Sequence, residues 1–432
     1  MKTSRISGFY KLTPEERLEK VKEFADLSDE EVELIRRTSK LPLDVADAMI
    51  ENVVGTFELP LGIATNFLID GKDYLVPMVI EEPSVVAAAS NGARMARVKG
   101  GFTTHYTGSI MIGQIQILTK NPISAKFEIL RHKDEIIEKA NELDSSIIRL
   151  GGGCKDLRVR IVEGRKPMLV VDLLIDVKDA MGANFVNSVC EHVAPFVAKI
   201  AGGRYLLRIL SNLCPFRLAM AKAIFDKKTI GGEEVVEGIM DAYEFAKADV
   251  FRCATHNKGI MNGVCAVLIA TGNDFRAVEA SCHAYSAMHG YKPLTHYEVN
   301  EDGDLVGYIE LPMSVGVVGG SVKANPLAMI CLKILGVKTA EELARVIAAV
   351  GLAQNFAALR ALVTEGIQRG HMELHARSLA LSVGAKGEEV DRIVEIMIRE
   401  GKISMSRAKE LLEKLRSNGK EHDFDSGLSK QL

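Results

Sequence analysis

The sequence predicts an α+β fold in which a large mixed α/β domain carries an inserted ferredoxin-like domain and is followed by a small helical domain. Residues 109–212 show strand and helix patterns in the order β-α-β-β-α-β, the split β-α-β arrangement. Residues 1–108 and 213–370 mix helical patterns with short strands, and we assign them to the large domain. Residues 371–432 are helical in pattern and end in a polar tail that we expect to be loosely held.

The large domain is expected to begin with helices. Residues 13–16 (TPEE) and 28–31 (SDEE) each place an N-cap residue before an acidic first turn, which predicts helices between residues 14 and 51. Prolines and glycines then divide apolar segments into short strands. The alanine-rich run 85–98 is predicted as a helix.

The later elements follow from their periodicity. Within the insertion we predict a strand at 110–118, a helix at 124–143, strands at 157–163 and 168–177, a helix at 183–200 and a strand at 204–210. Beyond it we predict a helix around 274–287, a hairpin at 297–311, and helices at 339–350, 353–365 and from 373 to 415.

The composition excludes several classes of function. A net charge of −3 gives no reason to expect nucleic acid or a membrane surface as a partner. No apolar run approaches the ~18 residues that span a bilayer, and the polar N-terminus is unlike a signal peptide. The seven cysteines are scattered and never spaced as CxxC, which argues for thiols in a reducing compartment. We expect a cytoplasmic protein.

The stretch 254–280, ATHNKGIMNGVCAVLIATGNDFRAVEA, carries the most informative polar residues. Its pattern predicts two glycine-bearing turns joined by a buried element, with Lys258 in one and Asp274 in the other. In a partly dry site each charge favours the charged form of the other, while burial opposes both. On spacing alone a structural lysine–aspartate pair is the favoured alternative, because such pairs are common.

Two further side chains are candidates for acid–base chemistry. Glu82 lies beside Glu81 at a predicted strand–helix junction, where it could act as a general acid, although an exposed glutamate at a helix start is commoner. His371 and His375 would share a helix face, but Met372 replaces the glutamate of an HExxH motif, so no metal site is expected. Proton donation by His371 is the better interpretation.

A dinucleotide site is indicated by residues 179–184 (DAMGAN), which open the second helix of the insertion. Backbone N–H groups at such a helix start could hold a pyrophosphate, although glycine–alanine pairs there usually mean close packing. No G-x-G-x-x-G motif occurs, so an ordinary Rossmann fingerprint is absent.

Eight segments, in order, resemble hydroxymethylglutaryl-coenzyme A (HMG-CoA) reductase in its soluble class II form. They are ENVVGTFELP, VIEEPSVVAAAS, LGGGCKD, DAMGAN, ATHNKGIMNG, TGNDFRAVEA, VGVVGG and LAQNFAALRALVTEGIQRGHMELHAR. In this family a ferredoxin-like insertion holds the dinucleotide. The resemblance implies reduction of the HMG-CoA thioester to mevalonate and free CoA by two NAD(P)H, through mevaldehyde.

The resemblance assigns catalytic roles to Glu82, Lys258, Asp274 and His371. Lys258 would stabilise the oxyanion formed by the first hydride, and Asp274 would position it. Glu82 would supply a proton as mevaldehyde is reduced. His371 would protonate the departing CoA thiolate after being brought in by a mobile C-terminal flap, formed by the helices from Glu373 onward.

Further contacts are implied in the same way. The substrate contacts are Ser84, Arg252, Asn262 and Gln354, and Arg252 suits the free carboxylate of the glutaryl part. The dinucleotide contacts are Asp144, Ser146, Asp179, Met181, Gly182, Ala183 and Asn184. Family active sites form across a dimer interface, so residues 51–52 are expected near a neighbouring subunit, in a homodimer or a multiple of dimers.

Coenzyme choice is expected to depend on Asp144, which by the family pattern faces the adenosine ribose. A carboxylate there accepts hydrogen bonds from a free 2′-hydroxyl and repels a 2′-phosphate, which favours NADH. Ser146 replaces the bulkier apolar residue typical of strict NADH users, and Arg149 and Lys155 could accept the phosphate. NADPH use is therefore also possible, and no metal is implied.

Alternative functions are a non-catalytic CoA or dinucleotide sensor, a thioester enzyme that stops at the aldehyde, and a catabolic enzyme that oxidises mevalonate. The first predicts that one of the four catalytic residues is replaced by another residue type. The second predicts other residues at the positions of Lys258, Asp274 and Glu82. Neither change is present in the sequence. The third runs the same reaction backwards, and the sequence leaves its direction open.

Overall fold

The structure is a computed structural model that describes residues 2–37, 41–319, 322, 325–364 and 366–427. It has the predicted α+β class, with two separate β-sheets and many helices. The chain forms two compact units, one of Met1–Ile80 with Val86–Ala357 and one of Glu81–Val85 with Ala358–Leu432.

The larger sheet of the first unit has six strands in the order β2-β1-β3-β8-β10-β9. Its neighbouring strands are antiparallel except β1 and β3, which pair in parallel. The predicted hairpin at 297–311 is confirmed as β9 and β10. The strand bounds are β1 Leu61–Ile69, β2 Lys72–Val79, β3 Phe102–Tyr106, β8 Leu218–Phe225, β9 Thr295–Val299 and β10 Leu305–Pro312.

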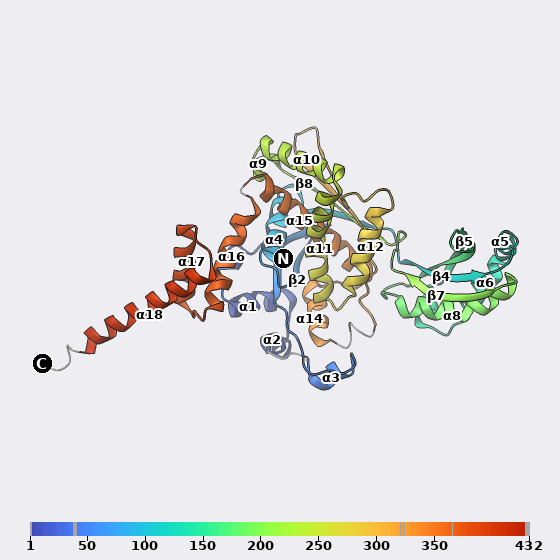
Figure 1. The fold of residues 1–432 in the computed structure, drawn as a ribbon, viewed down its shortest axis with the longest axis horizontal. Coiled ribbons are helices and arrows are strands. Elements are labelled where there is room, and N and C mark those ends of the chain that lie inside the picture. The colour runs from blue at the N-terminus through green and yellow to red at the C-terminus, as the bar shows by residue number, and fades with distance from the viewer. Residues whose placement is uncertain (1, 38–40, 320–321, 323–324, 365, 428–432) are drawn as a thin grey trace. The chain divides into compact units, whose positions relative to one another are not determined.

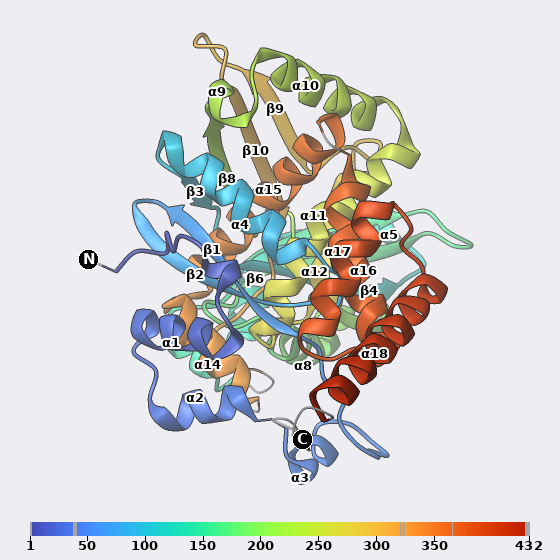
Figure 2. The same ribbon diagram turned by 90° about the vertical axis from the view of Figure 1, so that its left-hand side faces the viewer.

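Helices surround this sheet, and the first two begin as predicted. The side chains of Thr13 and Ser28 each accept a hydrogen bond from the backbone three residues later, in two complete capping boxes. Figure 2 shows the N-terminal helices beside α14, against which their apolar residues pack. The helix bounds are α1 Pro14–Ala25, α2 Asp29–Arg36, α3 Leu43–Asp47, α4 Val85–Ala96, α9 Lys227–Ile230, α10 Glu233–Ala248, α11 Val250–Ala270, α12 Phe275–Ala287, α14 Pro326–Leu335 and α15 Ala340–Val363.

Helix α15 is one continuous helix, so the prediction of two helices separated at residues 351–352 is wrong. Gly351 lies inside this helix, and a Cβ there would lie 3.1–3.3 Å from side chains of α11 and β10. The glycine therefore serves close packing. By length and composition α15 could cross a membrane, but 72% of its most apolar window is buried in the protein, as in a core helix.

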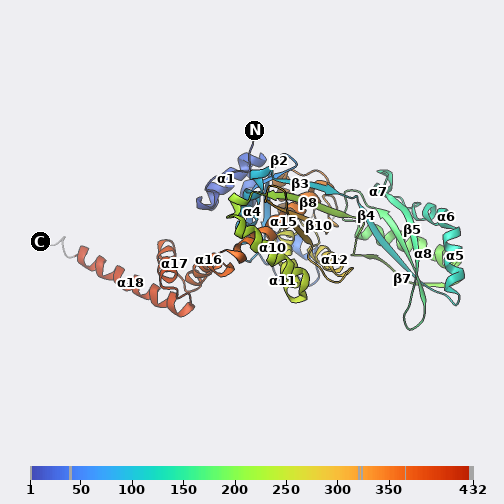
Figure 3. The same cartoon turned by 90° about the horizontal axis from the view of Figure 1, so that it is seen from above.

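The smaller sheet confirms the predicted β-α-β-β-α-β insertion. Its strand order is β5-β6-β4-β7, and all neighbours are antiparallel. Helices α5, α6 and α8 pack on one face of it, as Figures 1 and 3 show. The helix predicted at 124–143 is interrupted at His132. The bounds are β4 Ile110–Leu118, α5 Pro122–Arg131, α6 Lys133–Ala140, α7 Ser146–Arg149, β5 Gly153–Val162, β6 Met168–Asp176, α8 Ala183–Ile200 and β7 Arg204–Ser211.

The second unit is helical and has its own apolar core. It contains α16 (Ile367–Ser382), α17 (Glu388–Glu400) and α18 (Met405–Gly427). Side chains such as Ile393, Met397 and Leu411 form the core. The polar tail predicted from residue 418 begins as the end of α18, which runs to Gly427.

Candidate active site

Helix α11 carries Lys258 in its first half. The predicted glycine-bearing turn around this lysine is wrong, because the stretch lies inside the continuous helix. The helix begins where the Asp249 carboxylate accepts a hydrogen bond from Arg252 N at 2.7 Å. Lys258 is exposed, and Arg252 and Asn262 are half-buried.

Asn257 explains why this polar run can be helical. Its side chain is fully buried, and Nδ2 donates to Ser286 Oγ and to Lys292 O, both at 3.1 Å. Its Oδ1 accepts a hydrogen bond from Leu294 N at 3.0 Å. Partners distant in sequence thus satisfy a buried amide that a local pattern assigns to a turn.

One face of α11 is suited to an anionic ligand. Arg252, Gly259 and Asn262 follow the helical spacing i, i+7 and i+10, so they share a face. Partial burial lowers the pKa of Arg252 from its ordinary value, although a guanidinium stays charged at neutral pH. A Cβ built on Gly259 would have no atom of the described residues within 4 Å. The space between the two polar side chains is open.

The second predicted turn, at residues 271–274, is confirmed between α11 and α12. Asp274 is the N-cap of α12, and its Oδ1 accepts hydrogen bonds from Arg276 N and Ala277 N, both at 3.1 Å. The same carboxylate lies 3.3 Å from the Arg276 guanidinium. Asp274 keeps 38% of its side chain exposed, so it can still meet another group.

Lys258 and Asp274 do not meet within one chain. The helix runs on from Lys258 to Ala270, twelve residues later, before the turn that holds Asp274. At a rise of 1.5 Å per residue this separates them by about 18 Å along the axis. A lysine side chain also leans towards the N-terminus of its helix, away from that turn. Within the described residues, the helix geometry therefore does not bring the two predicted charges together in one chain.

The DAMGAN loop ends at the first turn of α8. Gly182 is the N-cap with φ +102°, and a Cβ there would lie 2.6 Å from Val177 Cγ1, so this position requires glycine. No side chain of the described residues caps the helix. The N–H groups of Ala183 and the residues after it are therefore available to an anion such as a pyrophosphate.

The Gly316 backbone joins this loop to the Asp274 turn. A Cβ built on Gly316 would lie 2.5 Å from Met181 N, so the two backbones are in direct contact. Gly316 N also donates to Asn273 Oδ1 at 2.8 Å. The DAMGAN loop and the turn that carries Asp274 are thus brought together, although they are far apart in the sequence.

Asp144 forms an ion pair with Arg149, and both side chains are largely exposed. Ser146 lies between them as the first residue of α7. Lys155 instead donates to the carbonyls of Gly151 and Gly152, at 2.9 Å each. Of the two cations expected to reach a 2′-phosphate, Arg149 is therefore the one beside Asp144.

Two predicted substrate contacts carry buried polar atoms without a hydrogen-bond partner in the described part of the chain, namely Ser84 Oγ and Gln354 Oε1. Ser84 has φ +72°, a conformation uncommon for a residue other than glycine and often associated with function. Unsatisfied buried atoms of this kind are consistent with a ligand. Ser84 belongs to the second unit and Gln354 to the first.

Glu82 and His371 also belong to the second unit. Glu82 is half-buried in the turn before α4. The backbone of His371 lies in α16, and its side chain is outside the described part of the chain.

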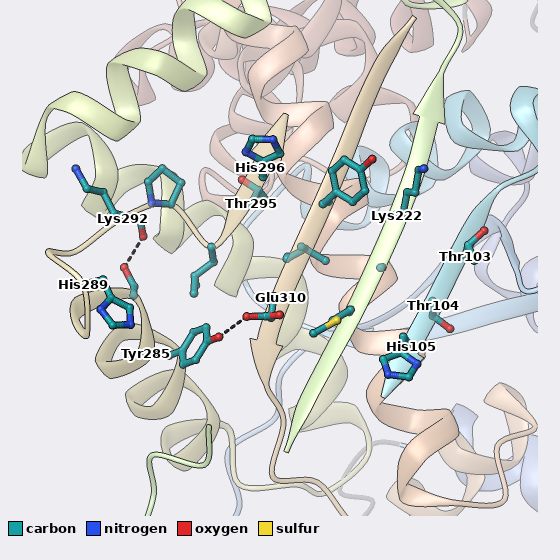
Figure 4. A pocket seen from close by; sticks show the side chains of 17 residues that line it. Thr103, Thr104, His105, Lys222, Tyr285, His289, Lys292, Thr295, His296 and Glu310 are labelled. Atoms are coloured by element: carbon teal, nitrogen blue, oxygen red, sulfur yellow. Dashed lines mark hydrogen bonds between the residues drawn. The ribbon is translucent and has the colours of Figure 1, made fainter. Parts of the chain in front are cut away.

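A groove of about 520 Å³ lies elsewhere, against strands β3, β8, β9 and β10 (Figure 4). Lys222, Tyr285 and Glu310 are among its lining residues, and the Tyr285 hydroxyl donates to Glu310. None of the predicted site residues lines it. Among the described residues, no group of three or more His, Cys, Asp or Glu side chains is arranged to hold a metal ion.

The sequence patterns did not reveal Arg217, which is fully buried beside the DAMGAN loop. Its acceptors there are backbone carbonyls, which leave no signature in side-chain patterns. The sequence could reveal this residue only if the burial of its side chain were known, and that burial depends on the fold.

Comparisons with known proteins identify the family of this chain. A family model described as hydroxymethylglutaryl-coenzyme A reductase matches residues 13–376. The 3-hydroxy-3-methylglutaryl-coenzyme A reductase of Archaeoglobus fulgidus is 71% identical over 418 residues, covering 96% of this chain and 95% of that protein.

Solved structures give the same result. A reductase of this name from Streptococcus pneumoniae has a TM-score of 0.81 at 42% identity, over 95% of this chain and 99% of that one. A class II enzyme of the same organism, bound to NADPH in open conformations, has a TM-score of 0.80 at 42% identity, over 94% and 100% of the two chains. The chain therefore belongs to the hydroxymethylglutaryl-coenzyme A reductase family, whose members are NAD(P)H-dependent oxidoreductases acting on the HMG-CoA thioester.

Proposed function

We propose that this reductase converts HMG-CoA to mevalonate in two hydride transfers, with Glu82, Lys258, Asp274 and His371 as its catalytic residues. The observation that carries the proposal is the contact chain Met181–Gly316–Asn273, which links the DAMGAN loop, our proposed dinucleotide site, to the turn that carries Asp274. A hydride donor held at that loop would react next to a carboxylate. The division into domains 1–108 with 213–370, 109–212, and a flap at 371–432 is part of the proposal.

Each role follows from the chemistry of charge development. The first hydride converts the thioester carbonyl to an oxyanion, which the Lys258 ammonium stabilises as a point cation. The collapse of this intermediate releases CoA thiolate, to which His371 gives a proton. The second hydride reduces mevaldehyde, and Glu82 protonates the alkoxide that forms. Asp274 holds Lys258 in its charged form and in place.

The substrate is held by Ser84, Arg252, Asn262 and Gln354 in this proposal. Arg252 binds the free carboxylate in a bidentate manner, and Asn262 lies on the same face of α11. The orphan atoms Ser84 Oγ and Gln354 Oε1 gain hydrogen-bond partners when the substrate is bound.

We further propose that the active enzyme is a homodimer or a multiple of dimers. The separation of about 18 Å along α11 means that the Asp274 that meets Lys258 must come from a second copy. Exposed apolar side chains near residues 51–52 in the sequence support this, because clustered exposed apolar side chains often mark protein–protein interfaces. They are Leu43 (60% exposed), Met49 (44%), Ile50 (65%), Val54 (100%) and Phe57 (92%).

NADH is the proposed preferred coenzyme, with NADPH also accepted. Asp144 accepts hydrogen bonds from the ribose hydroxyls of NADH. A 2′-phosphate would have to compete with Asp144 for Arg149, with which that carboxylate is already paired. The pneumococcal neighbour was solved with NADPH, which supports the proposal that NADPH is also accepted. A cytoplasmic location fits these coenzymes, and we propose neither nucleic acid nor membrane as a partner.

The test is HMG-CoA reduction with NADH and with NADPH in parallel, following absorbance loss and CoA release in wild type and Asp144→Ala. Two reduced nicotinamides per CoA, with faster turnover on NADH, support the proposal. The Asp144→Ala variant frees Arg149 and should gain activity with NADPH; Glu138→Ala, on the neighbouring helix, is the matched control. An unchanged NADPH rate in Asp144→Ala would refute the coenzyme argument.

The same preparation separates the alternatives. Mevalonate oxidation with NAD⁺ and CoA that is much faster than HMG-CoA reduction would favour the catabolic direction. Release of mevaldehyde after one NADH would favour an enzyme that stops at the aldehyde. Dinucleotide or CoA binding without turnover in either direction would favour a sensor.

A further inference from the structure

Arg217 lies where the chain passes from the insertion back into the large sheet, directly before β8. Its side chain is fully buried. Nε donates to the Tyr106 hydroxyl at 2.9 Å, and Nη1 donates to Met181 O at 3.0 Å. Nη2 donates to Ala180 O at 3.1 Å and to Val315 O at 2.5 Å. One guanidinium therefore holds three segments together.

The charge of this guanidinium is not balanced by an acid. Its four acceptors are three carbonyls and one hydroxyl, and within the described residues no carboxylate forms an ion pair with it. The titratable groups that face it are the Tyr106 hydroxyl and the Cys214 thiol, and burial raises the pKa of both. A buried cation without a counter-charge is costly, and an anion bound nearby would offset that cost.

The Ala180–Met181 segment also contacts the segment after Ser314, whose Val315 carbonyl is bound by the same guanidinium. Gly316 packs directly on Met181 N, and Val317 N donates to Asp179 O at 3.1 Å. The Asp179 carboxylate accepts a hydrogen bond from Ala340 N at 2.9 Å, at the start of α15. The DAMGAN loop is thus held by Arg217 and by backbone contacts with residues 316–317 and 340.

We propose that Arg217 is the positioning residue of the dinucleotide site. Its guanidinium donates hydrogen bonds to the successive carbonyls of Ala180 and Met181. These bonds fix the peptide units that lead into α8. The N–H groups at the start of that helix then keep the arrangement that binds a pyrophosphate. The buried charge of Arg217 lies at the Met181 carbonyl, directly before the Gly182 N-cap of α8. It also attracts an anionic ligand, because it acts through a low-dielectric interior. This inference rests on the dinucleotide site of the proposed function.

The test uses full-length protein and the variants Arg217→Met, Arg217→Lys and Gly316→Ala. NADH affinity is measured by fluorescence titration, CoA affinity by calorimetry, and folding by thermal melting. Arg160→Met is the control, since Arg160 pairs with Asp172 on the same insertion but at the far end of β5. We expect Arg217→Met to bind NADH at least about tenfold more weakly, with CoA affinity within about twofold.

The other variants separate positioning from general damage. Arg217→Lys keeps the charge but cannot grip both carbonyls, so it should recover part of the NADH affinity. Gly316→Ala keeps Arg217 and pushes on Met181 N, so it should weaken NADH binding selectively. If Arg217→Met does not fold, Gly316→Ala and Arg217→Lys decide the question.

Two results would overturn the inference: folded variants that bind NADH as wild type does, or equal losses of NADH and CoA affinity. Arg160→Met should change neither. Because affinity is measured without turnover, wild-type protein that binds NADH but does not reduce HMG-CoA would remove the proposed function and leave the Arg217 result valid.

Discussion

His256 Nε2 lies 2.7 Å from Thr295 Oγ1, which joins the buried side of α11 to strand β9. The Asn355 amide on α15 lies 3.2 Å from the same nitrogen, and its Oδ1 accepts hydrogen bonds from Thr295 and from Tyr297. Two residues further along α11, Lys258 is exposed. A neutral, buried polar network therefore fixes the helix that presents the proposed catalytic cation.

This network makes folding stability depend on pH. Burial lowers the pKa of His256 from 6.5 to about 3. The folded state thus favours the neutral imidazole, so its contribution is fully present above pH 6.5 and is lost as the pH falls towards 3. Between pH 7.5 and pH 5 the free energy of unfolding should fall by about 2 kcal/mol more in wild type than in His256→Gln. Urea unfolding at both pH values measures this difference.

The exposed His289 provides the control for that measurement. His289→Gln should lose as much stability as wild type over the same interval. If His256→Gln loses as much as well, the buried imidazole does not set the acid sensitivity, and other groups must do so.

Asn257 should be a major contributor to the stability of the first unit. Asn257→Ala leaves the buried Leu294 N without its partner, which costs about 1–3 kcal/mol. It also removes the hydrogen bonds that Asn257 donates to Ser286 Oγ and to the Lys292 carbonyl, although that carbonyl keeps Ser286 Oγ as a donor. We expect a loss of about 2–4 kcal/mol in the free energy of unfolding, and faster hydrogen exchange at Leu294. Thr255→Ala, an exposed position on the same helix, should change stability by less than about 0.5 kcal/mol. A small effect in Asn257→Ala would mean that water replaces the amide.

These residues also show where prediction from sequence stops. The capping boxes at Thr13 and Ser28 were predictable because every participant lies within four residues. The turn predicted for the first half of α11 is wrong because the partners of Asn257 lie some 30 residues away, at Ser286 and beyond. A local pattern cannot distinguish a polar turn from a helix whose polar side chains are satisfied by tertiary contacts.

The candidate site divides in the same way. The resemblance supplied the motif residues, but the contact that joins two of those motifs runs through the backbone of Gly316. Arg217 binds carbonyls of Ala180, Met181 and Val315, and any residue type supplies a carbonyl. Such a partner set becomes visible only once the chain is folded.

Asp274 caps α12 and is also a proposed catalytic residue, and substitution can separate these two roles. Asn caps a helix about as well as Asp, so Asp274→Asn should keep the hydrogen bonds to the start of α12 and melt within a few degrees of wild type. It removes the negative charge, so kcat should fall by at least about 100-fold. Asp274→Ala should lose the same activity and also about 1 kcal/mol of stability. Normal turnover in Asp274→Asn would assign this residue a structural role only.

A mixing experiment tests whether Lys258 and Asp274 act from different subunits. Lys258→Ala and Asp274→Ala should each be inactive alone. After unfolding and refolding together, half of the dimers are mixed, and each mixed dimer has one site with both residues intact. Activity should then return to about a quarter of wild type. The helix geometry predicts this outcome, because α11 keeps the two residues of one chain about 18 Å apart. Recovery no greater than that of either variant refolded alone would place both residues in one subunit.

Gly259 should show a conflict between stability and activity. It lies inside α11 with open space where a Cβ would be, so Gly259→Ala should stabilise folding by about 0.5–1 kcal/mol through helix propensity. The same methyl group would stand between Arg252 and Asn262, where we propose that the substrate binds, so KM for HMG-CoA should rise. Gly92→Ala on α4 is the opposite control: its Cβ would lie 2.3 Å from Ala353 O, so it should destabilise by about 1–3 kcal/mol. Chemical unfolding and steady-state kinetics on both variants give the two readouts. A stabilised Gly259→Ala with unchanged KM would show that the open space beside Arg252 is not filled by substrate.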